Sequence, residues 1–150
     1  MNQNLNNNML QRRPKCYILS GAPLSGKSTW AAKQKLPILS CDKLRFEYFG
    51  GEYKFDEKVE KEIWEDFYYR VGLFKEDFII DNTNCKLVYI NKIKENLNKD
   101  LNWEVEIVKF EASLLNSYCR NIKRYIFTKK WIPFKVIHQM KLNYNKLWKK

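Results

Sequence analysis

Residues 21–28 of this 150-residue chain read Gly21-Ala22-Pro23-Leu24-Ser25-Gly26-Lys27-Ser28. The stretch matches the phosphate-binding pattern G-x-x-x-x-G-K-[ST] at every fixed position. An apolar run, residues 16–19, precedes it and the helix-forming residues 29–35 follow it, which is the context that the pattern requires. An ordinary glycine-rich turn is the alternative, and it leaves Lys27 unexplained.

Each residue type in this stretch has a physical reason to hold phosphate. The glycines let backbone N–H groups turn toward phosphate oxygens, and the helix that follows points its positive dipole end at the same anion. Lys27 can reach the β- and γ-phosphates, and the Ser28 hydroxyl can bind Mg²⁺. We therefore predict a nucleotide site made of Gly21, Ala22, Pro23, Ser25, Gly26, Lys27, Ser28 and Thr29.

Size and cysteine content indicate one soluble domain. A chain of this length can bury a core without disulfides, and its four cysteines are spread singly with no C-x-x-C pair. Reduced thiols in the cytoplasm are therefore favoured over a disulfide framework or a metal site. No apolar run approaches the roughly 18 residues that a membrane helix needs. We expect a disordered arm over residues 1–13 and one domain over residues 14–150.

Positive charge is concentrated at the carboxyl end of the sequence. Residues 1–108 hold 17 Lys/Arg and 16 Asp/Glu, whereas residues 109–150 hold 11 Lys/Arg and a single acidic residue, Glu111. Clustered cations gain free energy by releasing counterions from phosphates, so this basic region predicts a polyanionic partner, most simply DNA or RNA. Compositional drift is the alternative, because the chain is rich in Lys and Asn throughout.

The hydrophobic pattern predicts strands that alternate with helices. Strands are expected over residues 15–20, 37–40, 78–81 and 103–110, the last at an edge of the sheet. Helices are expected over residues 27–35, 43–49, 56–74, 87–97 and 113–127, and from Pro133 onward. The final helix is expected to turn Val136, Ile137, Met140, Tyr144 and Leu147 inward. This alternation predicts a three-layer α/β fold in which a parallel sheet of about four strands carries helices on both faces.

Two aspartates are expected near the loop, because ligands of such sheets bind beyond the carboxyl ends of the strands. Asp42 follows the second strand, and Arg45 lies three residues later on the same helix face, so both can point toward an acceptor. Asp42 can equally be only a helix cap, and Arg45 only a surface cation. Asp81 ends an apolar strand and can hold Ser28 or a Mg²⁺-bound water, or it can simply form a turn.

Arg120 and Arg124 are four residues apart on the penultimate helix and form a cationic stripe. Phosphoryl transfer needs such cations near the developing charge, although solvated helix charges explain the stripe as well.

Four segments in the same order resemble the kinase domain of phage-type polynucleotide 5′-hydroxyl kinases, over about residues 15–148. The segments are GAPLSGKSTW, SCDKLR, IIDNTN and YCRNIKRYIFTKKWIPFKVIHQM. The loop is common to a large superfamily, whereas the D-x-x-R, the D-N-x-N turn, the R-x-x-x-R lid and the x-P-x-x-V helix are more specific. The resemblance implies a P-loop NTPase fold, similar to adenylate kinase, with a carboxyl-terminal helical lid.

The resemblance also implies roles on the donor side of the site. The loop residues of the family bind ATP phosphates and Mg²⁺ and match Lys27 and Ser28, and the strand-end aspartate matches Asp81. The two lid arginines that hold donor phosphates match Arg120 and Arg124, of which Arg124 is implied to take part in catalysis.

On the acceptor side, the family's catalytic aspartate activates the 5′-hydroxyl and matches Asp42. The arginine that contacts the acceptor phosphate matches Arg45, and Thr83 lies in the acceptor-facing turn. Leu24 departs from the family, which often has glycine there, and Lys43 replaces the usual second aspartate.

An ATP- and Mg²⁺-dependent polynucleotide 5′-hydroxyl kinase, active in nucleic acid end repair, is thus the function that the resemblance implies. A kinase of a small hydroxylated metabolite or a nucleoside remains a second hypothesis. A non-catalytic module that binds nucleotide and nucleic acid is a third, although such a module would not need Asp42 as a base.

Overall fold

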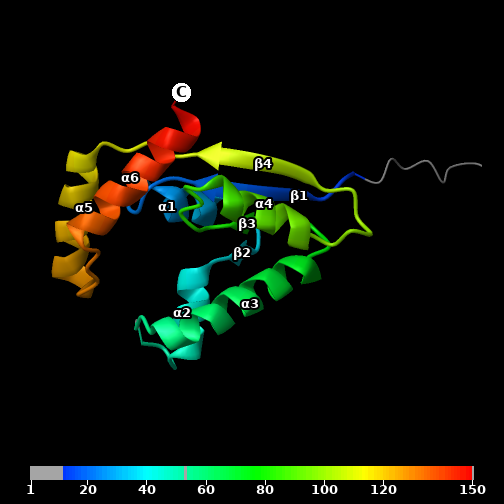
Figure 1. Ribbon diagram of the computed structural model, residues 1–150, viewed down its shortest axis with the longest axis horizontal. Coiled ribbons are helices and arrows are strands. Elements are labelled where there is room, and N and C mark those ends of the chain that lie inside the picture. The colour runs from blue at the N-terminus through cyan, green and yellow to red at the C-terminus, as the bar shows by residue number, and fades with distance from the viewer. Residues whose placement is uncertain (1–11, 53, 150) are drawn as a thin grey trace, which may run out of the picture.

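The computed structural model of the chain describes residues 12–52 and 54–149, so the expected arm over residues 1–13 lies almost wholly outside the described residues. A parallel sheet in the order β2-β3-β1-β4 forms the centre of the fold (Figure 1). Its strands are β1 (Lys15–Ser20), β2 (Ile38–Leu39), β3 (Phe78–Ile80) and β4 (Glu104–Lys109). The predicted four-stranded parallel sheet is confirmed.

Side-chain pattern sets the position of each strand in the sheet. Every residue of β3 is buried, and β1 is buried over most of its length, which suits the two central positions. Strand β4 alternates exposed and half-buried residues, as expected for an edge strand.

Helices cover both faces of the sheet, which confirms the three-layer α/β fold. They are α1 (Lys27–Lys33), α2 (Cys41–Tyr48), α3 (Glu57–Leu73), α4 (Leu87–Asn96), α5 (Leu114–Thr128) and α6 (Phe134–Trp148). The larger core joins one face of the sheet to α2, α3 and α4 through residues such as Ile63, Phe67 and Ile90. A smaller core around Leu19, Ala31 and Ile79 joins the other face to α1. None of the helices within residues 12–52 and 54–149 has the length and apolar content needed to cross a membrane.

Two expectations about helix boundaries are corrected. The cap of α2 is Ser40, whose hydroxyl accepts a hydrogen bond from the Lys43 N–H, so Asp42 lies within the first turn and is not the cap. Pro133 is the residue before α6 and not its first residue.

The inward face of α6 is also narrower than expected. Ile137 and Tyr144 are buried, but Val136 is 40% exposed and faces a cleft. The apolar residues of α6 therefore serve two surfaces. Ile137 and Tyr144 pack inside the protein, and Val136 lines the cleft.

Candidate active site

An open cleft of about 1530 Å³ lies at the carboxyl ends of the strands. It brings together residues from the loop after β1, the start of α2, the turn after β3, and the α5–α6 pair. Its lining includes Pro23, Gly26, Lys27, Ser28, Thr29, Asp42, Arg45, Asp81, Thr83, Arg120 and Arg124. Gly21, Ala22 and Ser25 are buried within the loop itself.

Backbone conformation makes the loop between β1 and α1 concave. Gly26 has a φ of 100°, which L side chains rarely adopt, and a Cβ on Gly21 would lie 2.6 Å from the Phe110 carbonyl oxygen. Leu24 adopts a φ of 65° at the position where the resembling family often has glycine. A left-handed conformation costs a non-glycine residue about 1–2 kcal/mol. Leu24 therefore keeps a backbone conformation that glycine would adopt at lower cost.

The Lys27 ammonium group lies inside the loop. Its Nζ donates hydrogen bonds to the carbonyl oxygens of Gly21, at 2.9 Å, and Ala22, at 2.8 Å, and to Ser25 Oγ at 3.3 Å. Burial lowers the pKa of Lys27, while the nearby carboxylates of Asp81 and Asp42 act in the opposite direction. Nearby acidic groups thus help to hold a cation at the centre of the loop.

Hydrogen bonds from the turn after β3 fix the base of the loop. The Gly21 N–H donates to the Thr83 carbonyl at 2.9 Å, and Asn84 Nδ2 donates to the Leu19 carbonyl at 2.8 Å. Ser20 Oγ donates to the Asn84 carbonyl and accepts from Trp148 Nε1 at 2.8 Å. Asn84 is buried with a φ of 42°, a conformation that asparagine tolerates.

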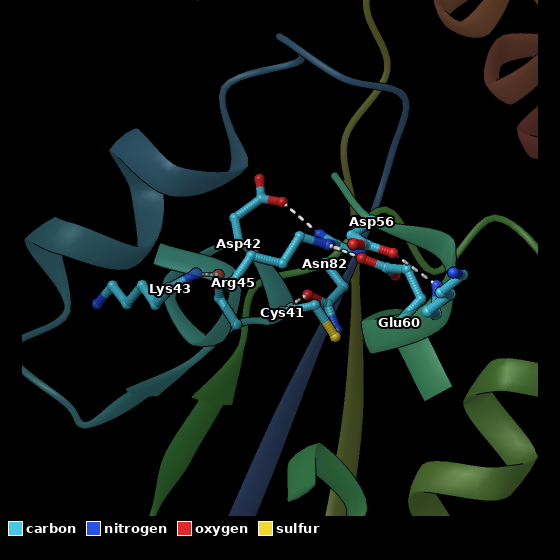
Figure 2. Close-up of polar contacts among 9 residues, drawn as sticks. Cys41, Asp42, Lys43, Arg45, Asp56, Glu60 and Asn82 are labelled. Atoms are coloured by element: carbon cyan, nitrogen blue, oxygen red, sulfur yellow. Dashed lines mark hydrogen bonds and ion pairs between the residues drawn. The ribbon is translucent and has the colours of Figure 1, made fainter. Parts of the chain in front are cut away.

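Asp42 and Arg45 form an ion pair at the wall of the cleft (Figure 2). Arg45 Nη1 donates to Asp42 Oδ1 at 2.7 Å, and Asp42 remains 69% exposed. On its other side Arg45 donates from Nε and Nη2 to both Glu60 oxygens, at 2.6 and 2.9 Å. This two-bond pairing raises the pKa of Arg45 and fixes the guanidinium plane, which in turn orients Asp42.

Asn82 attaches the start of α2 to the turn after β3. Its Oδ1 accepts from the Cys41 N–H at 2.9 Å, and its Nδ2 donates to Cys41 Sγ at 3.5 Å. Burial raises the pKa of Cys41 to about 12, so this thiol stays neutral beside Asp42. Asn82 therefore holds the helix that carries Asp42 at a fixed position relative to β3.

Ser28 and Asp81 are the residues that fit a magnesium ion. Ser28 is exposed at the start of α1, Asp81 directly follows β3, and both line the cleft beside Lys27. Within the described part of the chain no three His, Cys, Asp or Glu residues gather as a metal-binding group. Such a sparse donor set suits Mg²⁺, which usually takes one or two protein ligands and completes its shell with water and phosphate oxygens.

Helix α5 brings its cationic side to the loop. Arg120 Nη1 donates to the Leu24 carbonyl oxygen at 2.7 Å, and Arg124 lines the same cleft one turn later. Asn121 is buried on the other side and bonds both the N–H and the carbonyl of Ile132, which fixes the turn between α5 and α6. Arg120 thus contacts the loop after β1, and Arg124 lines the cleft that this loop helps to form.

Two contacts that hold the wall of the cleft have no signal in the local sequence pattern. Glu60 and Asn82 lie 15 and 41 positions from their partners Arg45 and Cys41, so no local motif connects them. Trp131 also lines the cleft, and only its place inside the longest of the four resembling segments draws attention to it.

Several solved structures have a similar fold, whereas neither a protein-family model nor a curated protein sequence matches the chain. A chain in the structure of the Pnkp1/Rnl/Hen1 RNA repair complex has a TM-score of 0.77 at 24% identity, over 94% of this chain and 47% of that one. A second structure of the Pnkp1/Rnl/Hen1 complex has a TM-score of 0.59 at 24% identity, over 77% of this chain and 42% of that one. A gluconokinase from Sinorhizobium meliloti 1021 has a TM-score of 0.54 at 16% identity, over 89% of this chain and 76% of that one.

This chain spans less than half the length of the two chains from the RNA repair complex. At these identities the likeness establishes the fold alone, which the chain shares with the gluconokinase and with a chain of the RNA repair complex. The three-layer α/β P-loop fold that the sequence predicted is therefore confirmed.

Proposed function

We propose that the protein is a kinase that transfers the γ-phosphoryl group of ATP to the 5′-hydroxyl end of a polynucleotide. The observation that carries this proposal is the position of Asp42, which lies exposed in the same cleft as Lys27 and Ser28 and is oriented by Arg45. A protein that only bound nucleotide would not need a carboxylate at that place.

In the proposed reaction, Asp42 accepts the proton of the acceptor hydroxyl as its oxygen forms a bond to the γ-phosphorus. The bond from that phosphorus to the bridging oxygen breaks, and ADP leaves. Lys27 and the backbone N–H groups of the loop stabilise the charge on the donor phosphates, and Arg124 stabilises the transferring group. A magnesium ion held by Ser28 and Asp81 would neutralise phosphate charge when bound.

Arg45 is proposed to position the acceptor as well as Asp42. Three N–H groups of its guanidinium already donate to Glu60 and Asp42. Arg45 would therefore act on the acceptor phosphate mainly through its fixed positive charge and less through new hydrogen bonds. Thr83 lines the same cleft. RNA is the favoured acceptor, because a similar chain belongs to an RNA repair complex.

A second candidate, a kinase of a small hydroxylated metabolite, is favoured by the structural similarity to a gluconokinase. The basic region argues against it, since residues 109–150 hold 11 Lys/Arg and a small acceptor such as gluconate, with its single carboxylate, can contact little of such a surface. Incubation with radiolabelled ATP, Mg²⁺ and a panel of acceptors separates the two. The panel contains 5′-hydroxyl RNA and DNA oligonucleotides, nucleoside 3′-phosphates and gluconate, and labelling of gluconate alone would contradict the proposal.

Arg124→Ala is expected to lower kcat for ATP more than it raises KM. The reason is that a lid cation interacts more strongly with the transition state than with bound ATP. Steady-state kinetics with a saturating oligonucleotide measure both constants, with Lys94→Ala on the exposed side of α4 as a charge-matched control. If Arg124→Ala has the kinetics of the wild type, Arg124 is only a surface charge and takes no part in catalysis.

Affinity for a single-stranded oligonucleotide is expected to fall steeply with salt, by about 0.7 in log–log slope for each phosphate neutralised. ATP affinity should change less, because the loop shields the ATP phosphates from solvent ions. Titrations between low and physiological salt measure both affinities.

A variant carrying Lys129→Glu, Lys130→Glu and Lys135→Glu is expected to lose oligonucleotide phosphorylation while still phosphorylating a nucleoside 3′-phosphate. A flat salt response would instead favour the small-molecule kinase.

A further inference from the structure

A row of aromatic rings runs from the cleft across the α5–α6 pair. Trp131, in the turn between these helices, lies 5.8 Å from the Tyr125 ring on α5 and 4.9 Å from the Phe134 ring on α6. Phe134 continues the contacts to Tyr118, at 4.5 Å. We call Tyr125, Trp131 and Phe134 the aromatic row.

The aromatic row lies on the surface and not in the core. Tyr125 is 46% exposed, Trp131 is 45% exposed and Phe134 is 40% exposed. Rings of this size usually contribute most by burial, so three neighbouring rings at the surface indicate a binding surface. Trp131 also lines the cleft, so the row is continuous with the proposed kinase site.

Cations accompany the rings and define the chemistry of the ligand. Lys129 Nζ lies 5.5 Å from the centroid of the Tyr125 ring, and both Lys129 and Lys130 line the cleft beside Trp131. Lys135 is exposed on the first turn of α6. Aromatic rings interleaved with lysines bind single-stranded nucleic acid, because bases stack on the rings while the cations follow the phosphates.

The aromatic row borders the same cleft as Asp42, where the acceptor is proposed to bind. Asp42 and Trp131 both line the cleft, the first from α2 and the second from the turn between α5 and α6. An acceptor whose 5′-hydroxyl lies at Asp42 must send its following nucleotides out of the cleft, and the aromatic row offers the surface on which bases can stack.

We infer that the aromatic row is a stacking platform for the bases that follow the 5′-terminal nucleotide of a single-stranded acceptor. This inference rests on the proposed function, since it assigns the next nucleotides of the same substrate. Stacking accepts any base, so the platform selects for single-stranded length and not for sequence.

Binding of a 5′-hydroxyl RNA hexanucleotide tests the platform without ATP. The probe carries a 3′-fluorescein, and a second probe has abasic sites at its second, third and fourth positions. Fluorescence anisotropy should show that the wild-type protein binds the abasic probe on the order of tenfold more weakly. Trp131→Ala should weaken binding of the intact RNA by a similar factor and remove most of the difference between the two probes. Trp131→Phe, which keeps a ring, should retain much of that difference.

Phe127→Ala is the matched control, because Phe127 is an α5 aromatic that is 76% exposed and does not belong to the aromatic row. It should bind both probes as the wild type does. Equal affinity of wild-type protein for the intact and abasic probes would overturn the inference, as would a Trp131→Ala variant weakened equally for both. The DNA counterpart of the probe reports whether the sugar matters.

Failure of the platform and failure of the kinase assignment are distinguishable. If the protein phosphorylates the hexanucleotide but binds the intact and abasic probes equally, the kinase assignment stands and the stacking platform is rejected. A base-dependent affinity without any phosphorylation would retain the platform and contradict the proposed kinase.

Discussion

Replacing Lys27 with alanine is expected to abolish phosphoryl transfer. The Lys27 ammonium group is the cation at the centre of the loop, where it donates to the Gly21 and Ala22 carbonyls and to Ser25. Removing one electrostatic donor from a comparable site costs about 3 kcal/mol or more in the barrier, which is on the order of a hundredfold in rate. Transfer of ³²P from ATP to a 5′-hydroxyl oligonucleotide measures the loss.

The control for this variant is Lys61→Ala, which removes an exposed lysine from α3 and should keep wild-type turnover. Because Lys27 also bonds the loop backbone, thermal unfolding must show that the Lys27→Ala protein is folded. Near-normal turnover in a folded Lys27→Ala protein would contradict the assignment of the phosphate-binding loop.

Asp42→Asn is expected to reduce turnover by about 10²- to 10⁴-fold, the range that general bases contribute. The amide retains the shape of the carboxylate but cannot accept the acceptor proton. ATP affinity should be nearly unchanged, because Asp42 is 69% exposed on α2 and Arg45 keeps both bonds to Glu60. Single-turnover rates and ATP binding, measured separately, give the two quantities.

Glu47→Gln is the control on the same helix, because it removes a carboxylate that pairs with Arg70 away from Asp42. It should leave turnover unchanged. If Asp42→Asn lost ATP affinity but kept its turnover at saturation, Asp42 would have only a structural role.

The sequence predicted the sheet well, because strand type depends on local patterns. The buried run at Phe78–Ile80 and the alternation at Glu104–Lys109 give strand type and position directly. Asp42 and Asp81 follow successive parallel strands, so topology alone brings them to one edge of the sheet.

The remaining features depend on contacts between distant segments. Nothing near Arg45 in the sequence indicates that Glu60 will hold its guanidinium from the next helix. The sequence pattern places the cap of α2 at Asp42, two residues after the true cap, Ser40. Both residues are good caps, and only the backbone conformation distinguishes them. Val136 has the spacing of a core residue, but the cleft lies where the core was expected.

The hydrogen bond from Trp148 to Ser20 joins positions 128 residues apart, near the end of the last helix and the end of the first strand. A chain that emerges from the ribosome therefore makes Ser20, at the end of β1, 128 residues before it makes Trp148. Until then Ser20 lacks one of its two hydrogen-bond partners, directly before the loop begins at Gly21. The hydrogen bonds at the base of this loop are therefore complete only after α6 has been made, when all four strands of the sheet have already been synthesised.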